Sequence, residues 1–514
     1  MNDPTVSPNL PPPPSPAATE KWRRCFSFPV FLGALLVVAT FLAIRGNLDA
    51  VRSSPGASPA QFFLEGDLWW HITTGKQILA THTWPRADNY SFTATGTVWI
   101  AYEWLGGIAL ALAERLGGLR ALAALFIALQ SAIILLIYLY AYLRCRNVRA
   151  AFLAAAVMLP LASQFSILRP QQFGYIFLLI TLVCLERFRQ GRGRALWPLP
   201  LVFAVWVNTH GSFVLGAVAL AVYAVCGLVE GRRGGMEASR WSPSQRRQLG
   251  VVSLLSVLAL TLTPYGARLA FYPFQLALSQ PLNVAIIREW RPLEWGQWYG
   301  VMVLLLLIFF LAGQIFFRPV CRLEDFVLLL LAVYATVRHA RFLMFFVPVF
   351  APMLAVLLAR WVPPLTDARD RYVLNAVLIL GICAGVVVFF PRARELTSAM
   401  RHRIPLDAVE YLNAHPAREP MFNDSDWGGY LIYTRWPAHK VFIDGRFDVY
   451  EYSGVLADYL HIIQAGPQGL RLLAKYNVQS CLLPRDSAPA NWLETQAGWQ
   501  RAYADELSVY LIRK

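Results

Sequence analysis

Charged residues are scarce in this chain of 514 residues. Asp, Glu, Lys and Arg make up 15% of it, whereas hydrophobic residues make up 57%. A soluble globular protein carries about 25% charged residues. Long apolar runs, such as residues 299–317, have the length that is needed to cross a bilayer. The sequence therefore predicts a polytopic α-helical membrane protein and excludes a single soluble enzyme domain.

Several sequence signatures of soluble enzymes are missing as well. The seven Cys residues show no paired or metal-ligand spacing, so a disulfide framework is not expected. The chain has no Gly-rich phosphate loop, no Ser-His-Asp spacing and no nucleotide fingerprint. The lack of a nucleotide site argues against an enzyme that uses a soluble nucleotide substrate.

The apolar runs predict a transmembrane domain over residues 27–390, with about eleven helices and a large first outer loop at 45–120. The predicted spans are 27–44, 121–143, 150–165, 171–186, 196–208, 212–229, 249–264, 299–317, 325–338, 342–361 and 373–390. Residues 104–118 and 267–280 are too short or too poor in large apolar residues for spans and suit interfacial helices. The Pro-rich segment 1–26 predicts a disordered tail.

Residues 391–514 have the composition of a water-exposed domain. Short apolar runs at 440–443, 478–483 and 507–512 suit strands, and helical runs lie between them. This alternation predicts a small α/β domain at the C-terminus.

Basic residues set the predicted orientation. With the N-terminus in the cytoplasm, the predicted inner segments hold 20 Lys and Arg against 9 Asp and Glu, and the outer loops hold 12 against 8. The C-terminal domain holds 14 of each. This distribution obeys the positive-inside rule and predicts a C-terminal domain outside the cytoplasm. The net charge of +15 therefore reflects topology, and no nucleic-acid partner is expected.

The unusual polar motifs all fall on the predicted outer side. Polar and ionisable groups at membrane level are costly and usually functional, so we expect an active site at this face. The motifs lie at 65–71, 99–104, 168–172, 206–212, 263–266, 288–295 and 337–341.

The first of these motifs places a carboxylate beside an aromatic pair and an imidazole. Asp67 precedes Trp69, Trp70 and His71, an arrangement that suits a general base or a metal ligand. Glu65 lies two residues earlier, and the two carboxylates would share a divalent cation only where the backbone is non-helical. The alternative interpretation is that Asp67 caps a helix and that the two Trp residues belong to the interfacial aromatic belt.

Cationic side chains on the same face favour a phosphate. Arg169 precedes a helix-breaking proline, His210 lies in a tight turn, and Arg338, His339 and Arg341 form the densest cationic cluster. The planar fork of arginine makes bidentate hydrogen bonds to phosphate. For each residue alone, snorkelling at the membrane interface is the competing explanation.

Two polar turns stand out in the C-terminal domain. Asp424 and Asp426 lie in one, and Asp444 and Arg446 lie in the other. These residues suit turn caps and an internal salt bridge. The alternative is that they dock a substrate or close the membrane site, in which case the domain packs on the outer loops and acts as a lid or acceptor platform.

Four motifs resemble those of bacterial membrane proteins that are described as GT-C-like. They are EGDLWWHITTGKQIL at 65–79, WIAYEWLGG at 99–107, NDSDWGGYLIY at 423–433 and KVFIDGRFDVY at 440–450. The predicted architecture also resembles the GT-C superfamily of glycosyltransferases, which use sugars linked to polyprenyl phosphates. In that superfamily the first-loop acid is a base towards the acceptor or a metal ligand, and Asp67 is the matching position. The chain lacks the WWDYG signature of oligosaccharyltransferases and has Glu-Gly-Asp where protein O-mannosyltransferases have adjacent Asp and Glu.

The resemblance implies an inverting sugar transfer from a polyprenyl phosphate to a glycan, lipid or protein acceptor at the outer face of a bacterial inner membrane. Asp67 would take the acceptor proton, assisted by His71 or Glu103, and the cationic residues would neutralise the leaving phosphate. No cofactor is required by the sequence, although a divalent cation at Asp67 and Glu65 is an alternative. The expected substrate-lining residues are Trp69, Trp70, Trp99, Trp104 and Glu289.

A second hypothesis is a lipid-linked glycan transporter or a catalytically inert scaffold of envelope glycan assembly. Transporters often contain internal repeats and mid-membrane charges. This chain has no convincing repeat, and its polar motifs gather at one face, which favours the enzyme.

Overall fold

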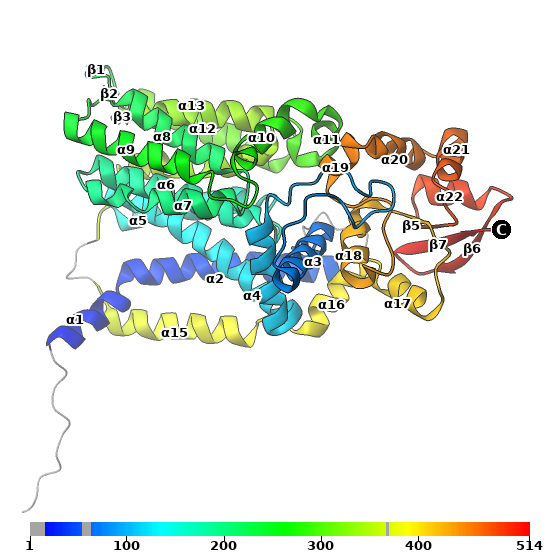
Figure 1. Ribbon diagram of the computed structural model, residues 1–514. Coiled ribbons are helices and arrows are strands. Elements are labelled where there is room, and N and C mark those ends of the chain that lie inside the picture. Colours follow the sequence, from blue (N-terminus) through cyan, green and yellow to red (C-terminus); the bar gives the residue numbers. More distant parts are fainter. Residues whose placement is uncertain (1–15, 54–62, 366–369) are drawn as a thin grey trace, which may run out of the picture.

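The structure is a computed structural model that describes residues 16–53, 63–365 and 370–514. A helical bundle forms one end of the molecule, and a small sheet with short helices forms the other (Figure 1). The predicted disordered tail at 1–26 falls partly outside the described residues. Within it, Pro16–Cys25 form helix α1, so the prediction of disorder is wrong for these ten residues.

Helices make up the bundle, and their lengths vary widely. They are α2 (Phe28–Ser53), α3 (Gly66–Thr81), α4 (Trp104–Cys145), α5 (Val148–Ser163), α6 (Gln171–Arg189), α7 (Leu199–Val207), α8 (Phe213–Cys226), α9 (Pro243–Ala259), α10 (Ala267–Ser279), α11 (Pro281–Ile286), α12 (Trp298–Phe317), α13 (Leu323–Arg338), α14 (Leu343–Leu358) and α15 (Tyr372–Val388). Short 3-10 helices lie at η1 (Gly193–Leu196), η2 (Arg288–Trp290) and η3 (Ala340–Phe342). A small sheet of β1 (Gly231–Arg233), β2 (Met236–Ala238) and β3 (Cys321–Arg322) lies at the far end of the bundle.

Among the described residues, five helices are long and apolar enough to cross a membrane. They lie at Trp22–Ser53, Trp104–Cys145, Gln171–Arg189, Trp298–Phe317 and Ala340–Leu358. Tyr372–Val388 and Ala393–Arg401 would add a sixth if this pair, bent by 56°, is a single span. The predicted spans at 150–165, 196–208 and 212–229 correspond to shorter apolar helices, so the predicted count of eleven is not reached by length and composition.

Helix α4 is kinked between the predicted interfacial stretch at 104–118 and the predicted span at 121–143. Gly117 and Gly118 have non-helical dihedral angles, and the φ of Gly118 is +57°. Glycine adopts this left-handed region without steric cost. The stretch predicted to be interfacial at 104–118 is therefore set at an angle to the long apolar segment that follows it.

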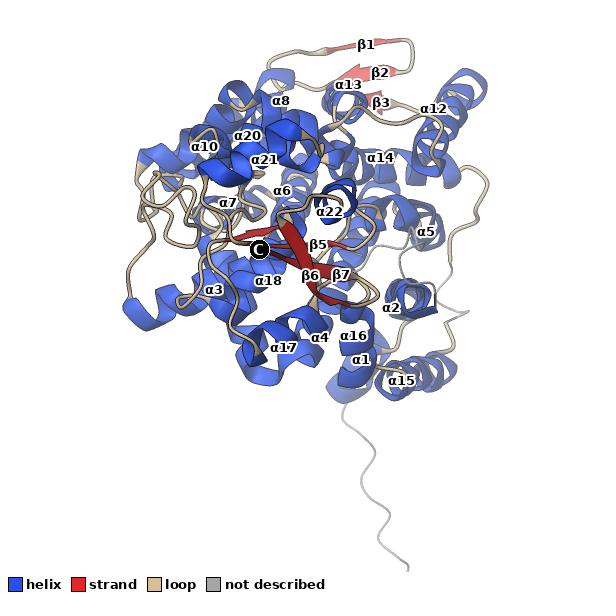
Figure 2. Cartoon of the chain, turned by 90° about the vertical axis from the view of Figure 1, so that its right-hand side faces the viewer, coloured by secondary structure: helices blue, strands red, loops and turns tan. Residues whose placement is uncertain are grey.

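The C-terminal segment is built on a four-stranded mixed sheet in the order β4-β5-β7-β6 (Figure 2). Strands β4 and β5 are parallel, and β7 pairs antiparallel with both β5 and β6. The strands are β4 (Met421–Asn423), β5 (Ser480–Pro484), β6 (Trp499–Ala504) and β7 (Ser508–Arg513). The helices are α16 (Ala393–Arg401), α17 (Leu406–Ala414), α18 (Ser425–Arg435), α19 (Phe447–Tyr452), α20 (Val455–Ile463), α21 (Pro467–Lys475) and α22 (Ala488–Glu494).

One predicted strand does not join this sheet. Within residues 440–443, Val441 forms an isolated bridge with Ser91 and a bend follows at Phe442. The prediction of a sheet strand is wrong here because these apolar side chains are buried against the loop as well as the sheet. Phe442 contacts both Phe92 and Phe422.

The first outer loop and the C-terminal segment share one hydrophobic core. It contains Trp70 and Trp99 of the loop region together with Trp427 and Tyr450 of the C-terminal segment. Helices α3 and α18 also meet closely at their glycines, because a Cβ at Gly66 would collide with the backbone of α18. The C-terminal segment thus packs on the outer loop rather than standing apart from it.

Candidate active site

Asp67 lies in the first turn of α3 and forms an ion pair with Arg169. Its Oδ2 lies 2.9 Å from Nη2 of Arg169, and its Oδ1 accepts a hydrogen bond of 3.3 Å from Nε1 of Trp70. Arg169 is held at the start of α6 by Pro170, whose ring cannot continue a helix towards the N-terminus. The sequence predicted Asp67 as a catalytic group and Arg169 as a phosphate ligand, and the structure brings them together.

The same guanidinium links Asp67 to Glu65. Nη2 of Arg169 lies 3.7 Å from Oε2 of Glu65. Within the described parts of the chain, no three His, Cys, Asp or Glu side chains are grouped to hold a metal ion. The predicted metal site at Glu65 and Asp67 therefore has no third ligand of this kind there, and an arginine occupies the position between its two carboxylates.

The C-terminal segment closes over Asp67. A Cβ built at Gly445 would collide with Oδ1 of Asp67, so the backbone of the turn between Asp444 and Arg446 lies directly on this carboxylate. Asp426 approaches from α18: burial raises its pKa, and the charge of Asp67 raises it further. Both predicted polar turns of the C-terminal segment thus reach the site.

Two further carboxyl groups near the site are shifted towards neutral pH. Burial raises the pKa of Glu65 to about 7, although the charge of Arg169 opposes the shift. Burial and the charge of Asp426 raise the pKa of Asp424 to about 7. Asp424 also caps α18 by accepting from the backbone N–H of Asp426, as the turn-cap interpretation predicts.

Glu103 lies between two histidines just before α4. Its Oε2 is 3.2 Å from Nε2 of His71, and its Oε1 is 3.3 Å from Nε2 of His210. The backbone N–H of Ser212 donates to Nδ1 of His210, so a neutral His210 carries its proton on Nε2 and donates it to Glu103. His210 was predicted to bind phosphate, but in this structure it contacts a carboxyl group.

Burial is the largest cause of the pKa shifts of Glu103, His71 and His210. It raises the pKa of Glu103 to about 8 and lowers the pKa of His210 to about 3. It also lowers the pKa of His71 well below its ordinary value. Near neutral pH, Glu103 therefore retains a proton while both imidazoles are neutral, a combination in which a proton can be held or passed on with little charge separation.

A small cavity of about 10 Å³ adjoins this cluster. That volume is about the least that holds one water molecule. Among its lining residues are Trp70, His71, Trp99, Tyr102, Glu103 and Trp104. Three of the four predicted substrate-lining Trp residues thus surround a space for water, which is far too small for a sugar. Trp69 instead packs on Tyr430 and Tyr433 of α18.

The predicted cationic cluster at 338–341 separates in the structure. Arg341 lies over the ring of Trp290 at 4.1 Å and reaches to 4.0 Å from Glu289. Nδ1 of His339 lies 2.5 Å from the carbonyl oxygen of Trp290. Arg338 is exposed and forms no ion pair with any residue that the structure describes. Only Arg341 points its charge towards Glu103 and His210, whose pKa values it lowers.

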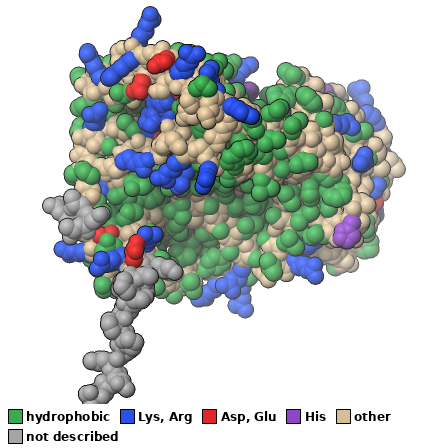
Figure 3. Space-filling view, turned by 60° about the vertical axis from the view of Figure 1, so that its left-hand side comes forward, with side chains coloured by type: hydrophobic (Ala, Val, Ile, Leu, Met, Phe, Trp, Pro, Cys, Tyr) green, Lys and Arg blue, Asp and Glu red, His purple; other side chains and the backbone are tan. Residues whose placement is uncertain are grey.

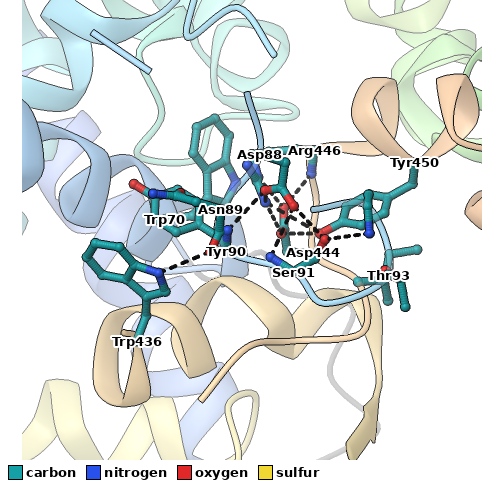
Figure 4. Close-up of polar contacts among 12 residues, drawn as sticks. Trp70, Asp88, Asn89, Tyr90, Ser91, Thr93, Trp436, Asp444, Arg446 and Tyr450 are labelled. Carbon is teal, nitrogen blue, oxygen red and sulfur yellow. Dashed lines mark hydrogen bonds and ion pairs between the residues drawn. The ribbon is translucent and has the colours of Figure 1, made fainter. Parts of the chain in front are cut away.

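Arg446 locks the C-terminal segment to the outer loop (Figure 4). Its Nη2 lies 2.6 Å from Oδ2 of Asp444 and 2.7 Å from Oδ1 of Asp88, and all three side chains are almost fully buried. The guanidinium also lies 4.5 Å from the ring of Trp99. The predicted internal salt bridge between Asp444 and Arg446 is present, but it extends to a residue of the loop.

Sequence reasoning missed Asp88 and Asp448. Asp88 binds Arg446, and Asp448 accepts a hydrogen bond from Tyr272 of α10, which joins the C-terminal segment to the bundle a second time. Asp88 in the sequence Pro-Arg-Ala-Asp-Asn looks like an ordinary turn residue. A buried arginine is often paired with more than one carboxylate, but the sequence does not show that Arg446 is buried or that Asp88 lies beside it.

Comparisons with known proteins identify the fold. No family model and no curated protein sequence matches the chain. The oligosaccharyltransferase of Archaeoglobus fulgidus tethered to an acceptor peptide is 12% identical, with a TM-score of 0.50 over 93% of this chain and 74% of its own. The same protein in complex with Zn and sulfate is 13% identical, with a TM-score of 0.51 over 93% and 73%.

ArnT from Cupriavidus metallidurans in the apo state is 15% identical, with a TM-score of 0.50 over 96% of this chain and 98% of its own. The oligosaccharyltransferase and ArnT are both GT-C glycosyltransferases. Identities this low show the fold alone. The chain is therefore a membrane protein with a GT-C-like fold.

Proposed function

We propose that this protein transfers a sugar from a polyprenyl-phosphate-linked donor to an acceptor at the outer face of a bacterial inner membrane. The observation that carries the proposal is the position of Asp67. Its carboxylate lies in a GT-C-like fold, between the guanidinium of Arg169 and the backbone of Gly445. A general base and a phosphate-binding cation are thus side by side, as such a transfer requires.

In the proposed reaction, the acceptor hydroxyl oxygen attacks the anomeric carbon and its proton passes to Asp67. The bond between the anomeric carbon and the phosphate oxygen breaks, and polyprenyl phosphate leaves with the electron pair. Attack opposite the leaving group inverts the anomeric centre. Arg169 neutralises the charge that grows on the phosphate, with Arg341 as the second cation.

The carboxyl groups around Asp67 favour an acceptor that approaches from the C-terminal segment. Glu65 shares the guanidinium of Arg169 with Asp67, and Asp424 and Asp426 belong to the C-terminal segment that covers the site. We infer that the C-terminal segment acts as an acceptor platform and supplies no base of its own.

The transporter hypothesis predicts a different experimental outcome. The full-length protein is reconstituted into vesicles prepared from bacterial envelope lipids, which supply acceptors, and receives a polyprenyl-phosphate donor with a labelled sugar. Label that enters a new glycosidic product, with release of polyprenyl phosphate, supports the transferase. Label that crosses the bilayer on an intact donor overturns the proposal in favour of transport.

A further inference from the structure

Four arginines without carboxylate partners gather at the end of the bundle opposite the C-terminal sheet. Arg192 and Arg194 flank the start of η1, and Arg246 and Arg247 lie in the first turns of α9. None of the four has a carboxylate oxygen within 4.0 Å among the residues that the structure describes. Nε of Arg246 is even shielded from solvent without a hydrogen-bond partner there. We call these four residues the arginine seam.

A hydrogen bond holds the two halves of the seam together. Nε2 of Gln248 donates to the carbonyl oxygen of Gly193 over 2.7 Å. A Cβ at Gly193 would lie closer to Oε1 of Gln248 than van der Waals contact allows, so this side chain packs closely on the backbone between Arg192 and Arg194. The hydrogen bond thus joins the two segments that carry the arginines.

The carboxylates near this end are already used by other arginines. Glu186 pairs with Arg322 at 2.7 Å, Asp325 with Arg144 at 2.8 Å, and Glu324 with Arg189 at 2.8 Å. These carboxylates are buried.

The two remaining carboxylates of the neighbouring segments, Glu230 and Glu237, belong to the hairpin of β1 and β2 and lie outside ion-pair distance of the seam. No carboxylate of the described residues therefore neutralises the seam, and its guanidinium groups are free to bind an anion from outside the protein.

The seam borders apolar side chains that face outward. Trp197, three residues after Arg194, is 51% exposed, and Leu201 is 70% exposed. Figure 3 shows Lys and Arg gathered beside apolar surface on this side of the molecule. Tryptophan next to arginine is typical of the level where lipid head groups meet the hydrocarbon core.

We propose that the arginine seam binds the head group of an anionic phospholipid. The phosphate would lie between the guanidinium groups of η1 and α9, while the acyl chains would lie along Trp197 and Leu201. Arginine suits this role because its fork makes bidentate bonds to phosphate oxygens. Basic pockets between transmembrane helices bind anionic head groups by the same chemistry. This site lies at the end of the bundle away from the C-terminal sheet and does not depend on the proposed transfer.

The test measures lipid binding to the purified full-length protein. The variant Arg192→Gln/Arg194→Gln/Arg246→Gln/Arg247→Gln is compared with the wild type and with Arg394→Gln/Arg471→Gln, which removes two exposed arginines of the C-terminal segment. Each protein is titrated with fluorescent phosphatidylglycerol in detergent and in phosphatidylcholine vesicles. Thermal unfolding in phosphatidylcholine checks that each variant folds, and the pair Arg192→Gln/Arg194→Gln replaces the fourfold variant if that one does not.

We expect the wild type and the control to bind phosphatidylglycerol more tightly than phosphatidylcholine. Each seam arginine removed should weaken the preference by about fivefold at low salt, because one arginine near an anionic surface contributes about that much. Equal binding of the two lipids by the wild type would overturn the proposal. So would a folded fourfold variant with wild-type preference, or displacement of the lipid by inorganic phosphate at similar concentration.

Discussion

Gly445 lies directly against the carboxylate of Asp67, so that a Cβ at this glycine would collide with Oδ1. One residue belongs to the C-terminal segment and the other to the first turn of α3. Their contact means that the candidate base is surrounded by both parts of the molecule. The C-terminal segment therefore forms one wall of the candidate site.

Replacing Gly445 with alanine should disturb the site with little effect elsewhere. The new methyl group must displace Asp67 or lift the turn, and a misplacement of about 1 Å costs about a hundredfold in rate. Gly498→Ala is the matched control, because a Cβ there meets no atom within 4 Å. We expect the first variant to lose transfer at a nearly unchanged melting temperature. If the folded Gly445→Ala variant transferred sugar at the wild-type rate, the turn at Asp444–Arg446 would have no role in catalysis.

Arg446→Met tests how the C-terminal segment is held. The variant leaves the carboxylates of Asp88 and Asp444 buried without their cation, and breaking a buried pair costs about 3–5 kcal/mol. The free energy of unfolding, measured by denaturant in detergent micelles, should fall accordingly. Arg501→Met removes an exposed pair with Glu494 and should leave it nearly unchanged. An equal change in the free energy of unfolding for both variants would show that the buried ion pairs of Arg446 do not stabilise the contact between the C-terminal segment and the loop.

Glu103→Gln should change how stability depends on pH. Burial raises the pKa of Glu103 from 4.5 to about 8, so the folded protein keeps a proton that the unfolded chain releases in this range. The contribution of Glu103 to stability is therefore full below about pH 4.5 and is lost as the pH rises to about 8. Glutamine does not titrate, so the melting temperature of the variant relative to the wild type should rise between about pH 5 and pH 8. A difference that is constant with pH would contradict this account.

Arg169→Gln should lower the rate of transfer far more than Arg338→Gln. Arg169 lies 2.9 Å from Asp67, whereas Arg338 is exposed and at the edge of the predicted cluster. Loss of a group that stabilises transition-state charge costs about a hundredfold to a thousandfold in kcat. We expect that loss for Arg169→Gln and nearly wild-type kcat for Arg338→Gln, measured with the same lipid-linked donor. A larger loss of kcat for Arg338→Gln than for Arg169→Gln would indicate that the phosphate binds at the 338–341 cluster instead.

The sequence predicted the components of the site better than their partners. Asp67, Glu103 and Arg169 stand out in the sequence because each polar motif follows or precedes an apolar run, and such ends are expected to meet at one membrane face. Their pairing was not found. The sequence did not indicate the contact of His210 with Glu103 or the ion pair of Arg169 with Asp67. Ion pairs between distant segments depend on distances that no local pattern records.

The helices and strands show the same limit. Runs such as Trp298–Phe317 are apolar throughout, and the structure has a helix there. Residues 440–443 have the apolar pattern of a strand, yet they lie between the sheet and the outer loop. A pattern of apolar residues predicts that they are buried, but it does not predict which part of the chain packs against them. Residues 70–104 and the C-terminal segment share one core, and this arrangement depends on the fold of the whole chain.

The most direct test of the proposed function compares Asp67→Asn with Asp49→Asn. Both changes remove one carboxylate, but Asp49 pairs with Arg45 and Arg52 on α2 rather than with Arg169. Transfer from a labelled polyprenyl-phosphate sugar is measured with both folded proteins in envelope-lipid vesicles. Our account predicts a loss of at least about a hundredfold for Asp67→Asn and wild-type turnover for Asp49→Asn. Unchanged turnover by folded Asp67→Asn would contradict it.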